Sequence, residues 1–135
     1  MDAVDIVNKM LDNDSFSKWL GVELLEIKPG YCRISMEVRE EMLNGFKLAH
    51  GGISYSLADS ALAFASNSNG KHALSIETSI SHVAAVKEGD VLIAEAEEKK
   101  LGKTTGLYYI SLKNSTGKEV AFFKGTVFLT DKNWE

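Results

Sequence analysis

The residues with the clearest chemical potential lie close together in the segment HGGISYSLAD, residues 50–59. Gly51 and Gly52 stand where the following apolar pattern should begin a helix, so their backbone N–H groups are among the donors that a helix leaves unpaired at its start. With the partial positive charge of the helix dipole, these donors can hold an oxyanion or polarise a carbonyl, and glycine lets a ligand approach the backbone. A tight loop-to-helix turn is the alternative explanation for two glycines.

Asp59 is a carboxylate in the middle of a helical pattern that is otherwise small and apolar. A partly desolvated carboxylate has a raised pKa, which is a typical condition for a general base or a carboxylate nucleophile. The alternative is an aspartate that points to solvent beside Ser56, from the one polar stripe of the helix. At 1.5 Å per residue, Asp59 lies roughly 13 Å along the axis from His50, too far for both to serve one carbonyl in one chain. A two-fold dimer with antiparallel central helices would bring the helix start of one subunit to Asp59 of the other.

The element that must position these groups is a central helix, expected over residues 51–69. Apolar residues recur every four positions at Ile53, Leu57 and Ala61, and the pattern stops at NSNG, where Gly70 suits a left-handed helix stop. A helix that is apolar over most of its circumference is generally wrapped by other structure. Its many small residues would let either a sheet or a second copy of the helix pack closely.

The rest of the chain predicts an antiparallel sheet. Two strand-like runs flank a turn at Pro29, and the second run, residues 31–39, alternates with Cys32 on its apolar face. Four further strand-like runs follow the central helix and are interpreted as a meander with short turns. With an amphipathic N-terminal helix over residues 1–15, these elements predict an α+β fold in which residues 1–135 form one domain.

The composition of the chain argues against several classes of binding partner. A formal net charge of −4 argues against a general nucleic-acid binder, which usually presents a basic face. The single cysteine, Cys32, allows no intramolecular disulfide and suits a reducing compartment. No segment reaches the roughly 18 apolar residues of a membrane span or has the form of an export signal. We therefore expect a cytoplasmic protein that binds neither nucleic acid nor membrane. The histidines and Cys32 lack metal-ligand spacing, so we expect no metal and no cofactor.

Four segments carry a family pattern: the motif NGxxxxHGG that begins at Asn44, then SLADSALAFASNSNG, EGDVLIAEAE and GKTTGLYYISLKNSTGKEVAFFKG. Together they resemble the hotdog-fold acyl-CoA thioesterases, in their phenylacetate-degradation (PaaI) branch, from about Phe16 to Gly125. The resemblance implies a hotdog fold, a long central helix wrapped by an antiparallel β-sheet. It also implies homodimers that pair into homotetramers, and hydrolysis of acyl-CoA thioesters without a metal.

The resemblance also assigns roles residue by residue. It places the acidic catalytic residue on Asp59, acting from the opposite subunit, and the carbonyl-polarising backbone amide on Gly51. The polar groups on the thioester side fall on Asn44 and His50. Asp59 either activates water or attacks the thioester directly, and both mechanisms stay open.

Two further residues are candidate substrate contacts. Gly52 is the second glycine amide at the helix start. Ser75 is the nearest match to a strand serine that helps to place water in a related branch, with an ordinary strand serine as the alternative.

We therefore predict a thioesterase that hydrolyses a small or aromatic acyl-CoA, of the phenylacetyl-CoA kind, to free acid and CoA. The alternative is a non-catalytic acyl-CoA-binding or regulatory hotdog domain, but binding alone has no need of the carboxylate at Asp59. A serine hydrolase is not indicated, because the chain has no Gly-x-Ser-x-Gly motif.

Overall fold

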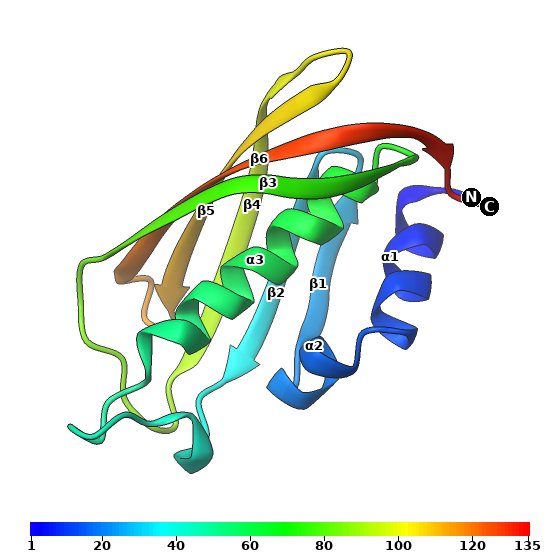
Figure 1. Cartoon of the computed structure of the whole chain (residues 1–135). Helices are drawn as coiled ribbons and strands as arrows, with labels where there is room; N and C mark the ends of the chain where they lie inside the picture. The colour runs from blue at the N-terminus through cyan, green and yellow to red at the C-terminus, as the bar shows by residue number, and fades with distance from the viewer.

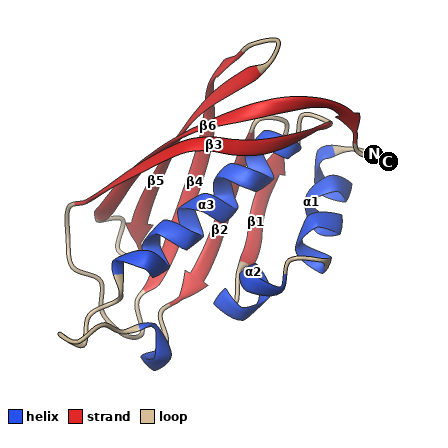
Figure 2. Ribbon diagram, in the orientation of Figure 1, coloured by secondary structure: helices blue, strands red, loops and turns tan.

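A curved sheet of six antiparallel strands wraps around one long helix in the computed structural model, which describes residues 1–135 (Figure 1). The helices are α1 (Ala3–Asp12), α2 (Ser15–Leu20) and α3 (Gly51–Asn67), with a short 3-10 turn at Glu40–Met42. The strands are β1 (Glu23–Lys28), β2 (Tyr31–Glu37), β3 (Lys71–His82), β4 (Val91–Leu101), β5 (Thr105–Asn114) and β6 (Glu119–Asn133). The predicted α+β architecture, a long helix wrapped by an antiparallel sheet after a short N-terminal helix, is confirmed (Figure 2).

The order of the strands differs from the expected meander. The sheet runs β1-β2-β4-β5-β6-β3, so β3 does not pair with β4, the strand that follows it in the chain. β4 pairs with β2 on one side and with β5 on the other, which leaves β3 to pair with the free side of β6. β3 therefore forms one edge of the sheet.

The N-terminal region forms two helices, where a single helix was expected over residues 1–15. Asp2 caps α1 by accepting the Asp5 N–H at 2.9 Å. The Asp14 carboxylate accepts the Ser17 N–H, also at 2.9 Å, and starts α2. Because a capping residue takes non-helical backbone angles, Asp14 interrupts the first helix. None of the helices has the length and hydrophobicity required to cross a bilayer.

The end of α3 is set by its contact with the β1–β2 hairpin. The helix begins at Gly51, as expected, and ends at Asn67, two residues before the expected 69. The Ser68 hydroxyl donates to the Ala65 carbonyl at 2.6 Å and accepts the Gly30 N–H at 2.9 Å. These bonds tie the last turn of α3 to the turn between β1 and β2, so the helix stops there.

Most of α3 is buried against the concave face of the sheet. Leu57, Ala61 and Phe64 are fully buried. The closest approach is to β6, where a β-carbon on Gly125 would stand 2.5 Å from Leu62 Cδ2, so glycine is what permits this contact.

Cys32 is part of this core, as its alternation in β2 predicted. Its Sγ donates to the Ala61 carbonyl at 3.2 Å, and burial raises the pKa of the thiol to about 12. A protonated, buried thiol is inert, so Cys32 packs as a small apolar side chain.

Candidate active site

The start of α3 presents one backbone donor that is free to bind a ligand. His50 is the N-cap, and its Nδ1 accepts the Gly52 N–H at 2.8 Å while its carbonyl accepts the Ile53 N–H at 2.9 Å. The Gly51 N–H has no hydrogen-bond partner in the chain. Of the two glycine amides proposed from the sequence, Gly51 is thus the one available to a carbonyl oxygen, with the helix dipole behind it.

Gly51 lies against the imidazole of His82, the last residue of β3. A β-carbon on Gly51 would stand 3.1 Å from His82 Nε2, so a larger residue would require the ring to move. His82 comes from a distant part of the chain, 31 residues after Gly51. Its position beside the helix start follows from β3 lying at the sheet edge, which no local sequence pattern indicated.

Asn44 shapes the loop that leads into α3. Its side-chain Oδ1 accepts the N–H groups of Phe46 at 2.9 Å and Leu48 at 3.2 Å, and its own backbone N–H donates to the Leu48 carbonyl at 2.7 Å. Lys47, within this loop, has a positive φ of 58°. An asparagine side chain that bonds the backbone ahead of it stabilises such a turn. The loop is therefore held in one shape immediately before His50.

Asp59 is half-buried in the middle of α3 and forms neither a hydrogen bond nor an ion pair within the chain. Burial raises the pKa of its carboxyl, and the negative charge of Asp14, at the start of α2, raises it further. A carboxylate with a raised pKa and no cationic partner suits a general base or a nucleophile better than a structural ion pair.

Asp59 lines a cavity of about 370 Å³ between α1, α3, β3 and β6. Ser75 of β3 lines the same cavity, so the structure brings these two candidate residues together. The other walls are mainly apolar and include Met10 of α1, Val127 of β6 and Trp134. A concave, mostly apolar space with a few polar groups is the usual form of a small-molecule site.

The remaining candidate residues lie outside this cavity. Asn44, His50, Gly51 and Gly52 form none of its walls. Gly51 and Asp59 are on the same helix, and eight residues at the helical rise separate them by about 12 Å. One chain therefore holds the free amide of Gly51 and the carboxylate of Asp59 apart.

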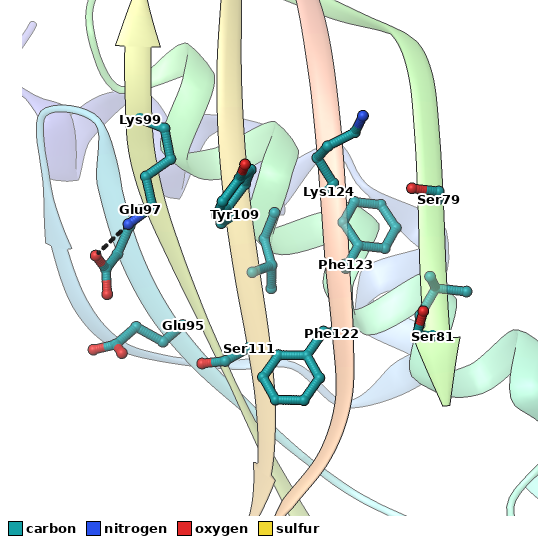
Figure 3. A pocket seen from close by; sticks show the side chains of 12 residues that line it. Ser79, Ser81, Glu95, Glu97, Lys99, Tyr109, Ser111, Phe122, Phe123 and Lys124 are labelled. Carbon is teal, nitrogen blue, oxygen red and sulfur yellow. Dashed lines mark hydrogen bonds and ion pairs between the residues drawn. The ribbon is translucent and has the colours of Figure 1, made fainter. Parts of the chain in front are cut away.

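A second hollow of the chain contains none of the candidate catalytic residues. A hollow of about 400 Å³ lies on the face of the sheet away from α3, where Tyr109, Phe122 and Lys99 line it (Figure 3). Lys99 there pairs with Glu97 at 3.5 Å, and none of the candidate catalytic residues is nearby. No three His, Cys, Asp or Glu side chains gather closely enough to hold a metal ion.

Known proteins match the chain over most of its length. Residues 46–121 match the thioesterase superfamily. The acyl-coenzyme A thioesterase PaaI of Escherichia coli is 39% identical over 116 residues, which is 86% of this chain and 83% of that protein. The solved structure of the E. coli PaaI protein superposes with a TM-score of 0.95 at 35% identity, and the match covers 97% of this chain and 95% of that one.

More distant relatives agree in both sequence and fold. Human acyl-coenzyme A thioesterase 13 is 29% identical over 121 residues, covering 87% of this chain and 86% of that protein. A Streptococcus mutans protein solved with bound acetyl CoA superposes with a TM-score of 0.81 at 28% identity, covering 84% of this chain and 91% of that one. The chain thus belongs to the thioesterase superfamily, and it is a hotdog-fold acyl-CoA thioester hydrolase similar to PaaI.

Proposed function

We propose that this enzyme hydrolyses a small or aromatic acyl-CoA, such as phenylacetyl-CoA, in a site assembled from two subunits. One observation carries the proposal: Gly51 has an unpaired amide, Asp59 has an unpaired carboxylate, and about 12 Å of helix separates them. Each is half of a thioester-cleaving site, and each needs a second copy of the chain to supply the other half.

The exposed surfaces favour such a pairing. β3 is an edge strand that exposes Leu74 by 64% and Ile76 by 60%, and a sheet edge with apolar side chains tends to pair with another strand. The part of α3 that the sheet leaves uncovered includes small residues, among them Gly52 and Ser56. A second α3, antiparallel across a two-fold axis, can approach there and set its start beside Asp59.

The chemistry is shared between the subunits. The Gly51 N–H of one subunit polarises the thioester carbonyl and, with the helix dipole, stabilises the developing oxyanion. Asp59 of the other subunit either takes a proton from a water molecule that attacks the carbonyl carbon, or attacks that carbon itself to give a mixed anhydride. Water then hydrolyses the anhydride, which releases the free acid and restores Asp59. The CoA thiolate is weakly basic and leaves without a strong general acid. Asn44 and His50 hold the loop and orient the thioester, and Ser75 contacts the water.

The cavity beside Asp59 takes the acyl group. Its volume of about 370 Å³ falls within the range of small-ligand sites, and Asp59 is the only Asp, Glu, Lys or Arg side chain in its lining. An apolar acyl group can therefore enter without desolvating another charge. The E. coli PaaI protein is described as part of the phenylacetic acid degradation operon, which supports an aromatic acyl substrate for this enzyme.

We further propose that the dimers pair into tetramers and that the enzyme acts in the cytoplasm. The outer face of the sheet exposes Tyr109 by 50% and Phe122 by 45%, and clustered exposed aromatic surface commonly marks a protein contact (Figure 3). The single, buried Cys32 suits a reducing compartment. Light scattering of the purified protein measures the subunit number.

A thiol-release assay over a series of acyl-CoAs, including phenylacetyl-CoA and medium-chain species, tests the proposed function. Asp59→Asn is expected to lower turnover by about 100-fold or more while the protein stays folded, because one catalytic group is lost without a change of shape. Asp131→Asn is the matched control, since Asp131 is exposed and is not one of the residues that line the cavity. Near-wild-type turnover by Asp59→Asn on every substrate would contradict the assigned role. Binding without any thiol release by the wild type would favour the non-catalytic alternative.

A further inference from the structure

Trp134, which follows β6, lines the cavity that also contains Asp59. Its indole N–H donates to Asn67 Oδ1 at 2.9 Å, and its ring stacks on His72 with centroids 4.1 Å apart and an interplanar angle of 23°. Its backbone N–H donates to the Gly70 carbonyl at 2.8 Å. Three separate contacts therefore hold the indole in one orientation.

Asn67 is the anchor of this arrangement. It is 3% exposed, and its Oδ1 also accepts the Ala73 N–H at 2.9 Å. Its Nδ2 donates to the Ala63 carbonyl at 2.8 Å and to the Ala73 carbonyl at 3.1 Å. Because rotating this amide would break several buried hydrogen bonds, the indole position is set by the backbones of α3 and β3.

Residues of α1 also lie against the part of the cavity lining that contains Trp134. Met10 lines the cavity together with Trp134, and Lys9 Nζ donates to the Glu135 carbonyl at 2.6 Å. The two ends of the chain lie side by side in Figure 1, next to the start of α1. The indole is thus packed into a wall that includes α1 as well as α3 and β3.

The cavity extends along α3 from the carboxylate to the indole. Asp59, Ala63 and Asn67 are spaced by four residues, so they share one face of the helix. All three line the cavity, and eight residues place Asn67 about 12 Å along the axis from Asp59. Ala63, with its small side chain, leaves the middle of this space open.

We propose that Trp134 forms the end wall of the acyl pocket and sets the longest acyl group that the enzyme accepts. The inference rests on the proposed function, since it takes Asp59 as the end of the cavity where the thioester reacts. An acyl chain that runs from Asp59 along α3 meets the indole. A longer chain must displace a ring held by a hydrogen bond and by stacking, whereas an aromatic acyl group can pack against it.

The test compares acyl-chain profiles of the wild type, Trp134→Ala and Trp134→Phe over phenylacetyl-CoA and straight-chain acyl-CoAs from butanoyl to palmitoyl. Opening the end wall is expected to raise the kcat/KM ratio of long to short chains by about 10-fold or more. Trp134→Phe keeps most of the wall and should shift the ratio less. Trp19→Ala is the matched control, because Trp19 lies on α2 outside the cavity. An unchanged ratio in Trp134→Ala, or an equal loss at every chain length, would overturn the proposal.

A second measurement does not depend on the folding of Trp134→Ala or on turnover. In Trp19→Phe, Trp134 is the sole tryptophan, so its emission reports on the end wall. Phenylacetyl and medium-chain thioether analogues of acyl-CoA are expected to shift this emission, whereas CoA alone is not. If the analogues bind but leave the emission of Trp134 unchanged, the proposal that Trp134 forms the end wall would be overturned. Thiol release by the wild type and by Asp59→Asn tests the proposed function separately. A failure of the proposed function can therefore be distinguished from a failure of the end-wall proposal.

Discussion

Leu62 of α3 occupies the space that a β-carbon on Gly125 of β6 would need, at 2.5 Å from that position. Helix and strand are therefore closer here than an alanine would allow. The contact fixes how deeply α3 sits in the curve of the sheet, and it lies three residues along the helix from Asp59.

Gly125→Ala is expected to destabilise the fold by about 1–3 kcal/mol, because the buried Leu62 side chain must move to relieve the overlap. Denaturant unfolding measures the change. Gly45→Ala is the matched control, since its added methyl group meets nothing within 4 Å, and it should change the stability by no more than about 0.5 kcal/mol. Equal stability of Gly125→Ala and the wild type would show that the core absorbs the extra methyl group.

Asp59→Asn is expected to stabilise the protein at neutral pH. Burial and the charge of Asp14 raise the pKa of Asp59 in the folded chain, so its ionisation costs folding free energy that an amide does not incur. Below the ordinary aspartate pKa the group is protonated in both folded and unfolded states and the cost disappears. Above the raised pKa the cost is fully present.

The difference in Tm between Asp59→Asn and the wild type should therefore grow as pH rises between those two pKa values, and then level off. Thermal unfolding at a series of pH values from acidic to neutral measures it. A difference that does not change with pH would contradict the raised pKa of Asp59.

Asp14→Asn is expected to move the acid limb of the activity profile to lower pH. The charge of Asp14 is, after burial, the second cause of the raised pKa of Asp59. Asparagine caps helices as well as aspartate, so the bond to the Ser17 N–H is kept while the charge is removed. The pH dependence of kcat/KM checks this shift. Asp12→Asn, two residues earlier at the end of α1, should leave the acid limb in place, and an unmoved limb in Asp14→Asn would contradict the coupling.

A mixed dimer of Asp59→Asn and Gly51→Val subunits is expected to regain one intact site. Valine at Gly51 meets His82 Nε2, 3.1 Å from the added β-carbon, and obstructs the amide. If equal amounts mix at random, half of the dimers are mixed and each has one of two sites, which restores about a quarter of wild-type activity. Asp59→Asn mixed with the double variant is the control, because it forms no intact site. Verified mixed dimers without activity would contradict the shared site.

The fold was predictable where the signal is local. The alternation of β2 identified Cys32 as a core residue, and the four-residue spacing of apolar side chains identified α3 and its start at Gly51. The pairing of β3 with β6 was not predictable, because it depends on both sides of β4 being occupied. The second helix was missed because an aspartate between polar residues, Asp14, gives a weak cap signal.

The candidate site also contains some features that a local sequence pattern indicates and others that it does not. Asp59 was identifiable because a carboxylate interrupts an apolar pattern on one helix. The positions of His82 beside Gly51 and of Trp134 beside Asn67 join distant parts of the chain, and no spacing along the sequence reports them. The candidate catalytic groups were thus easier to locate from the sequence than the proposed walls of the acyl pocket.

Because the outer side of β3 is unpaired within one chain, the turnover per enzyme molecule should depend on the enzyme concentration. With half of each proposed active site on a neighbouring chain, dilution below the dissociation constant would abolish turnover without unfolding either chain. Specific activity should then fall as the enzyme is diluted and recover as it is concentrated. A rate measured at very low enzyme concentration would therefore depend on the affinity between two β3 edges as well as on the rate of thioester hydrolysis.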